Sequence, residues 1–267
     1  MPRAHRYFLP NHVWHVTHRC HEKAFLLRFA RDRECYLHWL FEAKKRFSLR
    51  VLNYMVTSNH VHFLVGDTGE SVIARSMQLA AGRTAQDYNR RKGREGAFWE
   101  DRYHATAVEG DDHLYRCLVY IDLNMVRAGV VRHPLEWAHS GYREIQAPPE
   151  RYAIIDLAAL STLCGFRSVV DFQEAHHHWV DEAPAAGKTV REDRWSDSVA
   201  VGSEAYVEKV KRELDSKARN RDISEAGGTF ALREPRPPCR PHFGGTNDRL
   251  RRENTLYWKE SRASSEA

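Results

Sequence analysis

Residues 49–65 read LRVLNYMVTSNHVHFLV, two β-rich runs separated by Ser58 and Asn59. A polar pair between two such runs is typical of a tight hairpin. Successive side chains of a strand point to opposite faces, so His60 and His62 share one face and Val61 lies on the other. This stretch decides the fold, because it predicts a hairpin whose second strand presents two imidazoles side by side.

The segments on either side of this hairpin complete a sheet. Upstream, HVWHVTH at 12–18 alternates like a strand, and residues 31–47 have helical spacing. Downstream, the sequence predicts a helix at about 71–91, a short strand at 104–108 and a helix from Asp111 to about Ala128. The order βαββαβ predicts an α+β fold, namely a ferredoxin-like sheet with an added C-terminal helix.

Length and composition favour one or two domains in this chain of 267 residues. The paired prolines of APPERY at 147–152 predict a boundary between a domain at 1–147 and a mainly helical extension at 148–267 with an irregular, basic tail. The first domain holds 22 of the 41 Lys and Arg residues but only 16 of the 36 acidic residues, so it carries the excess positive charge. No apolar run has the ~18 residues of a membrane helix, and no secretion signal is evident, so we expect a cytoplasmic protein without a membrane partner.

The predicted helix from Asp111 has two unlike faces. One face is apolar, and the other carries His113, Arg116, Tyr120, Asn124 and Arg127. The polar face places a phenol and a carboxamide one turn apart between guanidinium groups, which suits a phosphate. A solvated helix face is the alternative, just as surface decoration is the alternative for the two histidines of the hairpin.

In four blocks the chain resembles the single-tyrosine HUH transposases, most closely the REP-associated tyrosine transposases. The blocks are HVTHRC at 15–20, VTSNHVHFLV at 56–65, GAFWEDRYHA at 96–105 and YIDLNMVRAGVV at 120–131. This resemblance covers about residues 12–146. It implies that Tyr120 is the nucleophile and that a divalent metal, Mg²⁺ or Mn²⁺, is bound by His60, His62 and Asn124.

The chain departs from the family pattern at two positions. Insertion-sequence relatives commonly have Gln where this chain has Asn124, which is a shorter side chain. The family motif usually reads NPV where this chain has Asn124, Met125 and Val126. Because proline breaks helices, its loss predicts that the helix continues and fixes Arg127 on the polar face.

The resemblance also implies an activity, that of a transposase-like endonuclease and strand transferase acting on single-stranded DNA. Such an enzyme cleaves at hairpin or palindromic elements through a 5′-phosphotyrosine intermediate. Phosphate contacts and base stacking are expected from a Gly-bearing basic loop and from the polar helix face, at Arg90, Arg91, Lys92, Arg94, Trp99, Arg102, Arg116 and Arg127. For any one of these residues, a solvated loop or a core edge is the alternative.

Several alternatives stay open at this point. The chain could be a domesticated protein that binds hairpin DNA without cutting it, or a metal-dependent RNA endonuclease. Relatives act either as dimers with shared active sites or as monomers, so Tyr120 could serve its own histidines or a neighbour's. The remaining histidines predict no site, because residues 176–178 read as a polar helix face and His15 and His18 fall on opposite faces of their strand.

Overall fold

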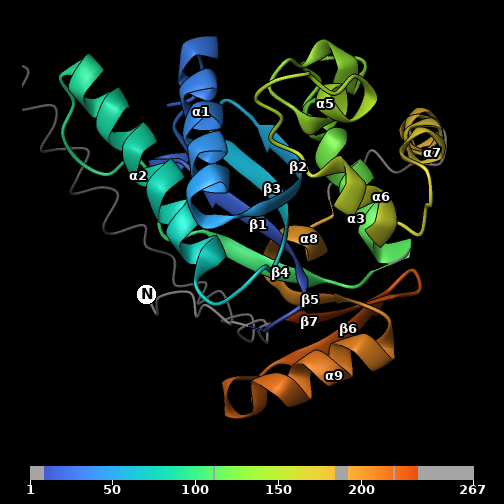
Figure 1. Cartoon of the computed structure of the whole chain (residues 1–267). Coiled ribbons are helices and arrows are strands. Elements are labelled where there is room, and N and C mark those ends of the chain that lie inside the picture. Colours follow the sequence, from blue (N-terminus) through green and yellow to red (C-terminus); the bar gives the residue numbers. More distant parts are fainter. Residues whose placement is uncertain (1–8, 111, 184–191, 219, 234–267) are drawn as a thin grey trace, which may run out of the picture. The chain divides into compact units, whose positions relative to one another are not determined.

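Seven strands of the described residues form one sheet in the order β2-β3-β1-β4-β5-β7-β6 (Figure 1). The computed structural model describes residues 9–110, 112–183, 192–218 and 220–233. Strand β4 pairs with β5 in parallel and the other neighbours pair antiparallel, so the sheet is mixed and the α+β class is confirmed. The strands are β1 (Val13–Arg19), β2 (Arg50–Val56), β3 (His60–Gly66), β4 (His104–Val108), β5 (Ser198–Gly202), β6 (Asp222–Ala226) and β7 (Thr229–Arg233).

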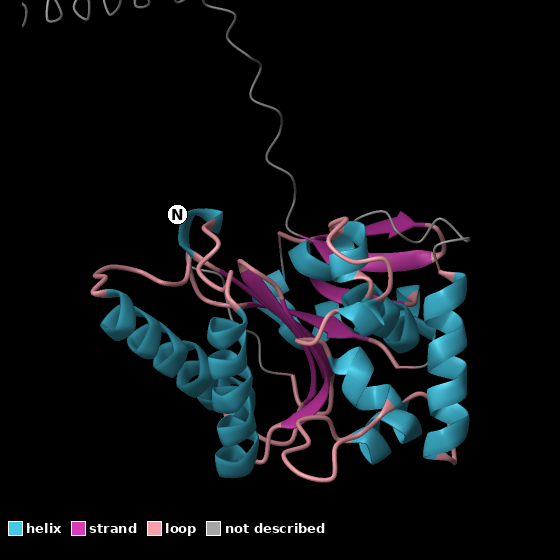
Figure 2. Ribbon diagram, turned by 90° about the horizontal axis from the view of Figure 1, so that it is seen from above, coloured by secondary structure: helices cyan, strands magenta, loops and turns pink. Residues whose placement is uncertain are grey.

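The first four strands follow the order predicted from the sequence. Strand β1 lies between β3 and β4, and β2 pairs with β3 to close the hairpin. Helices α1 (Ala30–Phe47) and α2 (Val72–Lys92) pack against each other on one face of these strands, as Figure 2 shows. The core on this face includes Phe63, whose ring stacks on Tyr36 with centroids 5.5 Å apart. Helices α1 and α2 therefore bury the face that is opposite to His60 and His62.

The other face is covered by α3 (Asp112–Asp122), which is followed by the short α4 (Asn124–Arg127). The predicted continuous helix to Ala128 is therefore wrong, because Leu123 has φ −77° and ψ 4° and interrupts it. Polar contacts to the sheet hold the residues on both sides of this break: Asp122 accepts from Asn53, and Asn124 contacts His62. Met125 in place of a proline therefore does not give one continuous helix, since these contacts direct both side chains toward the strands.

The extension contains the helices that its periodicity predicts, together with strands that it does not. After α5 (Gly141–Gln146) come α6 (Leu157–Leu163), α7 (Val169–Glu182), α8 (Arg194–Asp197) and α9 (Glu204–Leu214), and short 3-10 turns lie at His21–Lys23, Pro134–Glu136 and Asp215–Ala218. Strands β5, β6 and β7 continue the sheet past β4, where Ala107 and Val108 pair with Ala200 and Val201. The domain boundary at residue 147 stays a prediction, and most of the tail from about 226 onward lies outside the described residues. None of the helices in the described ranges is both long and apolar enough to cross a membrane.

Candidate functional site

The two histidines of β3 share the face that α3 covers. His62 is buried and His60 is half-buried, and their ring centroids lie 4.8 Å apart with the planes at 79°. The Nδ1 atom of His60 lies 3.0 Å from Thr57 Oγ1 and 2.7 Å from Asn59 Oδ1. These contacts hold the ring through Nδ1, an arrangement that presents Nε2 as the ligating nitrogen.

Asn124 meets His62 at the break between α3 and α4. The side-chain nitrogen Nδ2 of Asn124 lies 3.0 Å from Nε2 of His62. A rotation of the amide by 180° brings its oxygen to the same position, since the two ends of a carboxamide have nearly the same shape. The structure therefore brings together two of the three predicted ligands directly and places the third, His60, beside them.

His15 on β1 belongs to this cluster and was not predicted as a site residue. Its Nε2 lies 3.0 Å from His62 Nδ1, its Nδ1 lies 2.7 Å from the carbonyl oxygen of Trp195, and its ring stacks on that of His62 with centroids 5.1 Å apart. A single set of neutral tautomers satisfies this chain: Asn124 donates to His62 Nε2, His62 Nδ1–H donates to His15 Nε2, and His15 Nδ1–H donates to Trp195. His62 is thus held through Nδ1 in the same way as His60.

Burial keeps His15 and His62 neutral. It lowers the pKa of His15 to about 4, although the bond to the carbonyl of Trp195 opposes the shift. Burial also lowers the pKa of His62 well below its usual value, and the positive charge of Arg127 adds to this effect. A neutral imidazole is the form that binds a metal ion.

The signal that could have identified His15 is the strand register. Residues 15, 17 and 19 of β1 share a face, and Thr17 lies opposite His62 in the antiparallel pair. His15 therefore lies diagonally across from His62 on the same face. His18 is on the other face, as predicted, where its ring stacks on Trp99 with centroids 4.2 Å apart.

Tyr120 lies on α3 next to these histidines of its own chain. Its side chain is buried, and its ring centroid lies 6.3 Å from that of His62 and 6.1 Å from that of His15. The guanidinium of Arg127 lies over the ring, with Cζ 4.1 Å from the centroid, and it also donates to the carbonyl oxygen of Tyr120. The phenol and the paired imidazoles thus form one cluster, with a cation against the phenol.

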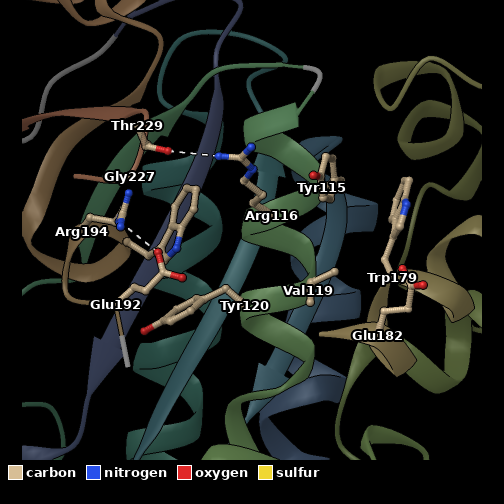
Figure 3. Close-up of a pocket in the computed structure, with 11 residues that line it drawn as sticks. Tyr115, Arg116, Val119, Tyr120, Trp179, Glu182, Glu192, Arg194, Gly227 and Thr229 are labelled. Carbon is tan, nitrogen blue, oxygen red and sulfur yellow. Dashed lines mark hydrogen bonds and ion pairs between the residues drawn. The ribbon is translucent and has the colours of Figure 1, made fainter. Parts of the chain in front are cut away.

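A cavity of about 340 Å³ opens beside Tyr120. Tyr120 and Arg116 of α3 line it together with residues of the extension, among them Glu192, Arg194 and Thr229 (Figure 3). The Nη1 atom of Arg116 donates to Thr229 Oγ1 at 3.3 Å, and Arg194 pairs with Glu192 at 2.9 Å. Arg116, one of the predicted DNA-binding residues, is therefore directed toward the extension.

The predicted basic loop is in part a helix. Arg90, Arg91 and Lys92 form the last turn of α2, which ends at Gly93 with φ 57°. The sequence predicted that the helix ends at about residue 91 and that the basic loop spans 90–96, so the helix ends one residue later than predicted and the loop begins at Gly93. Arg90, Arg91 and Lys92 are all exposed, and Arg91 also forms an ion pair with the buried Asp32.

The remaining residues predicted to contact DNA in this region differ in their accessibility. Arg94 is half-buried and donates to Asn89 Oδ1 at 3.1 Å and to the carbonyl of Ala97 at 2.8 Å. Trp99 donates to the carbonyl of Ala81 at 3.0 Å and packs against the core, so its ring lies at a core edge. Arg102 is exposed to solvent. Of the residues predicted to contact DNA in this region, Arg90, Arg91, Lys92 and Arg102 have the exposure that a direct phosphate contact requires.

His176 of α7 departs from the polar helix face predicted for residues 176–178. It is fully buried, and its Nε2 lies 2.8 Å from Oδ2 of the buried Asp122. Gln146 Nε2 lies 2.9 Å from His176 Nδ1, which completes the polar partners of the ring. His177 and His178 are largely exposed, as predicted. His176 thus connects α7 of the extension to α3, two residues after Tyr120.

The donor set at β3 and α4 fits a divalent metal ion. Two imidazole nitrogens and an amide oxygen suit Mn²⁺ by ligand type, and Mg²⁺ by availability. The rings of His60 and His62 are both held through Nδ1, which leaves Nε2 to bind a metal ion. Within the described ranges, no group of three or more His, Cys, Asp or Glu side chains is arranged to hold a metal ion, so this candidate site depends on Asn124 as well as on the histidines.

The comparisons with known proteins bear on the same segment. Residues 9–124 match the family model described as "Transposase IS200 like". Among solved structures, the chain is similar to a REP-associated tyrosine transposase bound to a REP hairpin, with 17% identity, a TM-score of 0.46, and 55% of this chain and 87% of that chain covered. It is also similar to a "putative transposase" from Deinococcus radiodurans R1, with 16% identity, a TM-score of 0.32, and 40% of this chain and 86% of that chain covered. A comparison with curated proteins found no match. The family match contains His60, His62, Tyr120 and Asn124.

Proposed function

We propose that the protein cuts and rejoins single-stranded DNA through Tyr120 with the help of a divalent metal ion, and the match of residues 9–124 to the IS200-like transposase model supports this proposal. The observation that carries the proposal is the cluster of Tyr120, His62 and Asn124 within one chain. The ring of Tyr120 lies 6.3 Å from that of His62, whose Nε2 contacts Asn124. A nucleophile beside a metal site is what phosphodiester cleavage requires.

The proposed reaction conserves the energy of the bond that it breaks. The phenolic oxygen of Tyr120 bonds to the phosphorus, the bond from phosphorus to the 3′ oxygen breaks, and a 5′-phosphotyrosine and a 3′-hydroxyl result. The phenolic proton is lost to solvent, and the departing 3′ oxygen takes up a proton. Attack by a 3′-hydroxyl on the phosphotyrosine reverses these steps and joins strands.

Different residues of the chain have different roles in this reaction. His60, His62 and Asn124 would hold Mn²⁺ or Mg²⁺, which when bound supplies positive charge next to a non-bridging phosphate oxygen. His15 and Thr57 orient the two imidazoles through Nδ1. Arg127, against the ring of Tyr120, favours the ionised phenol, because a nearby cation stabilises an oxyanion.

The proposed substrate is a DNA hairpin with a single-stranded flank. The support is the resemblance of the motifs, together with the similar REP-associated transposase that is bound to a REP hairpin. The short distances from Tyr120 to His15 and His62 support a site that is built from one chain. On this proposal a monomer contains a complete active site.

The test is a covalent adduct between protein and DNA. Incubating the protein with a flanked hairpin oligonucleotide and Mn²⁺ is expected to give an adduct that survives denaturing electrophoresis. Tyr120→Phe should abolish it, whereas Tyr115→Phe, on the same helix and beside the same cavity, should leave it intact. An adduct that persists in Tyr120→Phe rejects the assignment. Hairpin binding by the native chain without any adduct would favour the non-cleaving alternative, and cleavage of the RNA hairpin alone would favour the ribonuclease.

A further inference from the structure

Two phenylalanine side chains are exposed in the loop between β1 and α1. Phe25 is 65% exposed and Phe29 is 56% exposed. Leu27, which lies between them in the sequence, is fully buried. A loop that buries its leucine and leaves both aromatic rings in water exposes apolar area that a partner can cover, since large exposed apolar patches mark interaction sites.

Two cations lie beside the ring of Phe29. The guanidinium carbon of Arg28 lies 5.8 Å from the centroid of the Phe29 ring, and Nζ of Lys92 lies 5.5 Å from the same centroid. Both side chains belong to exposed residues, and so does Arg90 in the same last turn of α2. We call Phe25, Arg28, Phe29 and Lys92 the aromatic–basic surface. Aromatic rings interleaved with cations are what a single nucleic acid strand needs, because bases stack on rings and phosphates pair with cations.

The backbone of this loop is held in place by hydrogen bonds to the hairpin turn that precedes His60. The N–H of Leu27 donates to the carbonyl of Ser58 at 2.9 Å, and Asn59 Nδ2 donates to the carbonyl of Lys23 at 3.0 Å. Arg33 Nη1 donates to the carbonyls of Leu27 and Arg28. The rings are therefore presented by a loop whose backbone is attached to Ser58 and Asn59, the turn directly before β3.

Backbone strain in the same loop also supports a binding site there. Glu22 and Lys23 have φ of 53° and 58°, so two successive residues other than glycine adopt the left-handed conformation. Side chains with a Cβ rarely adopt it, and such strain persists where surrounding contacts over-determine it and is common at ligand-binding sites. The bond from Asn59 to the carbonyl of Lys23 is one of these contacts.

We propose that the aromatic–basic surface binds unpaired nucleotides of the substrate, with bases stacked on Phe25 and Phe29 and phosphates paired with Arg28 and Lys92. The strand would then pass along the Ser58–Asn59 turn to His60. This inference rests on the proposed function, which it deepens by assigning the single-stranded part of the substrate to a surface. The occupant is a nucleic acid strand, because a purely apolar partner would have no use for the flanking cations.

The test is equilibrium binding of a labelled hairpin with a single-stranded flank, measured by fluorescence anisotropy beside the same hairpin with a blunt end. Phe25→Ala and Phe29→Ala should each weaken binding of the flanked hairpin by about tenfold and leave the blunt hairpin nearly unchanged. Phe→Tyr at either position should retain affinity, and Phe→Leu should not, because stacking needs a ring. Tyr152→Ala is the matched control, since Tyr152 is an exposed aromatic residue outside this loop, at 75% exposure.

The cations give a second readout. Arg28→Ala combined with Lys92→Ala should reduce the slope of log Kd against log salt concentration by the amount expected for the loss of about two phosphate contacts. Unchanged affinity for the flanked hairpin in both Phe→Ala variants overturns the inference. So does an equal loss for the blunt hairpin, full rescue by Leu, or a change in sedimentation that shows the rings to be a contact between copies of the chain.

The outcome can be separated from that of the proposed function. Binding is measured without cleavage, so a native chain that forms no adduct but loses flank affinity in the Phe→Ala variants contradicts the proposed function and supports this surface. A native chain that forms the adduct, together with Phe→Ala variants that bind the flank normally, contradicts only this inference.

Discussion

The guanidinium of Arg127 lies over the ring of Tyr120, 4.1 Å from its centroid, and donates to the backbone carbonyl of the same residue. Within the described part of the chain, the Nη1 atom of Arg127 is buried without a hydrogen-bond partner. A buried cation with an unused donor beside the proposed nucleophile is placed to stabilise the charge that develops there.

Arg127→Ala is expected to slow adduct formation by roughly 10- to 100-fold, because it removes the cation next to the phenol. The variant should recover part of this loss at high pH, where the phenol ionises without assistance. Single-turnover adduct formation between pH 7 and 10 measures both effects. Arg127→Lys should form the adduct at a rate between those of the native chain and Arg127→Ala, since lysine keeps the charge but not the planar contact. An unchanged pH profile in Arg127→Ala would show that the guanidinium has only a packing role.

His15→Ala is expected to weaken Mn²⁺ binding by about 10- to 100-fold without removing a metal ligand, because His15 orients His62 through Nδ1. Isothermal titration calorimetry measures the affinity, and circular dichroism checks that the variant is folded. His38→Ala, an exposed histidine on α1, is the control and should bind Mn²⁺ like the native chain. Equal affinity in His15→Ala and the native chain would contradict the positioning role.

Asn124→Ala should lower the affinity for Mn²⁺ and the rate of adduct formation together, since it removes the oxygen ligand of the proposed site. Asn124→Asp should retain metal binding and shift the preference toward Mg²⁺, because a carboxylate is a harder ligand than an amide. Adduct yields with each metal across a concentration series measure this preference. Normal metal dependence in Asn124→Ala would exclude Asn124 as a ligand.

His176→Ala is expected to destabilise the protein by about 3 kcal/mol, because it leaves the buried carboxylate of Asp122 without its histidine partner. His178→Ala, two residues further along the same helix and largely exposed, should change the free energy of unfolding by less than about 0.5 kcal/mol. Urea unfolding followed by circular dichroism compares the two. Similar effects of the two substitutions would show that the buried pair contributes little.

Acid should destabilise the fold in part through His139. Burial, with the charge of Arg33 adding to it, lowers the pKa of His139 from 6.5 to about 4. Arg33 Nε donates to His139 Nδ1 at 3.2 Å, so the native state favours the neutral ring. Because the folded pKa lies below the unfolded one, the contribution is complete above about pH 6.5 and is lost as the pH falls toward 4.

The comparison of two variants measures this contribution. The free energy of unfolding of the native chain should fall more steeply between pH 6.5 and 4 than that of His139→Gln, which cannot take up the proton. Equal slopes would show that His139 does not contribute. An NMR titration of the native chain should place the midpoint of the His139 ring near 4.

The local parts of the site were predictable because they depend on spacing within one element. The alternation of β3 places His60 and His62 on one face. Spacing also predicted Tyr120 and Asn124 on one helix, but they lie in α3 and α4, on either side of the break at Leu123. The role of His15 was not predictable in this way, since it depends on the pairing of two strands and on the carbonyl of Trp195, far along the chain. Periodicity reports which face a residue occupies, but not which residue lies across from it.

Other features depend on tertiary contacts that outweigh local pattern. His176 is flanked by residues typical of an exposed helix, yet the buried Asp122 determines its position. Strands β5 and β6 were not predictable from alternation, because every residue of β5 is buried and four of the five residues of β6 are exposed. The break at Leu123 follows from contacts of its two neighbours with the sheet.

The parallel pairing of β4 with β5 has a consequence for shortened forms of the protein. A chain that ends at residue 147 lacks β5, so the N–H and C=O groups of β4 that pair at Ala107 and Val108 would be open along that side. An open edge of this kind is a template for a strand from another molecule. Shortened forms that keep all the residues of the family match should therefore be prone to aggregate through β4. In the full chain, β5 of the extension pairs with this edge and covers it.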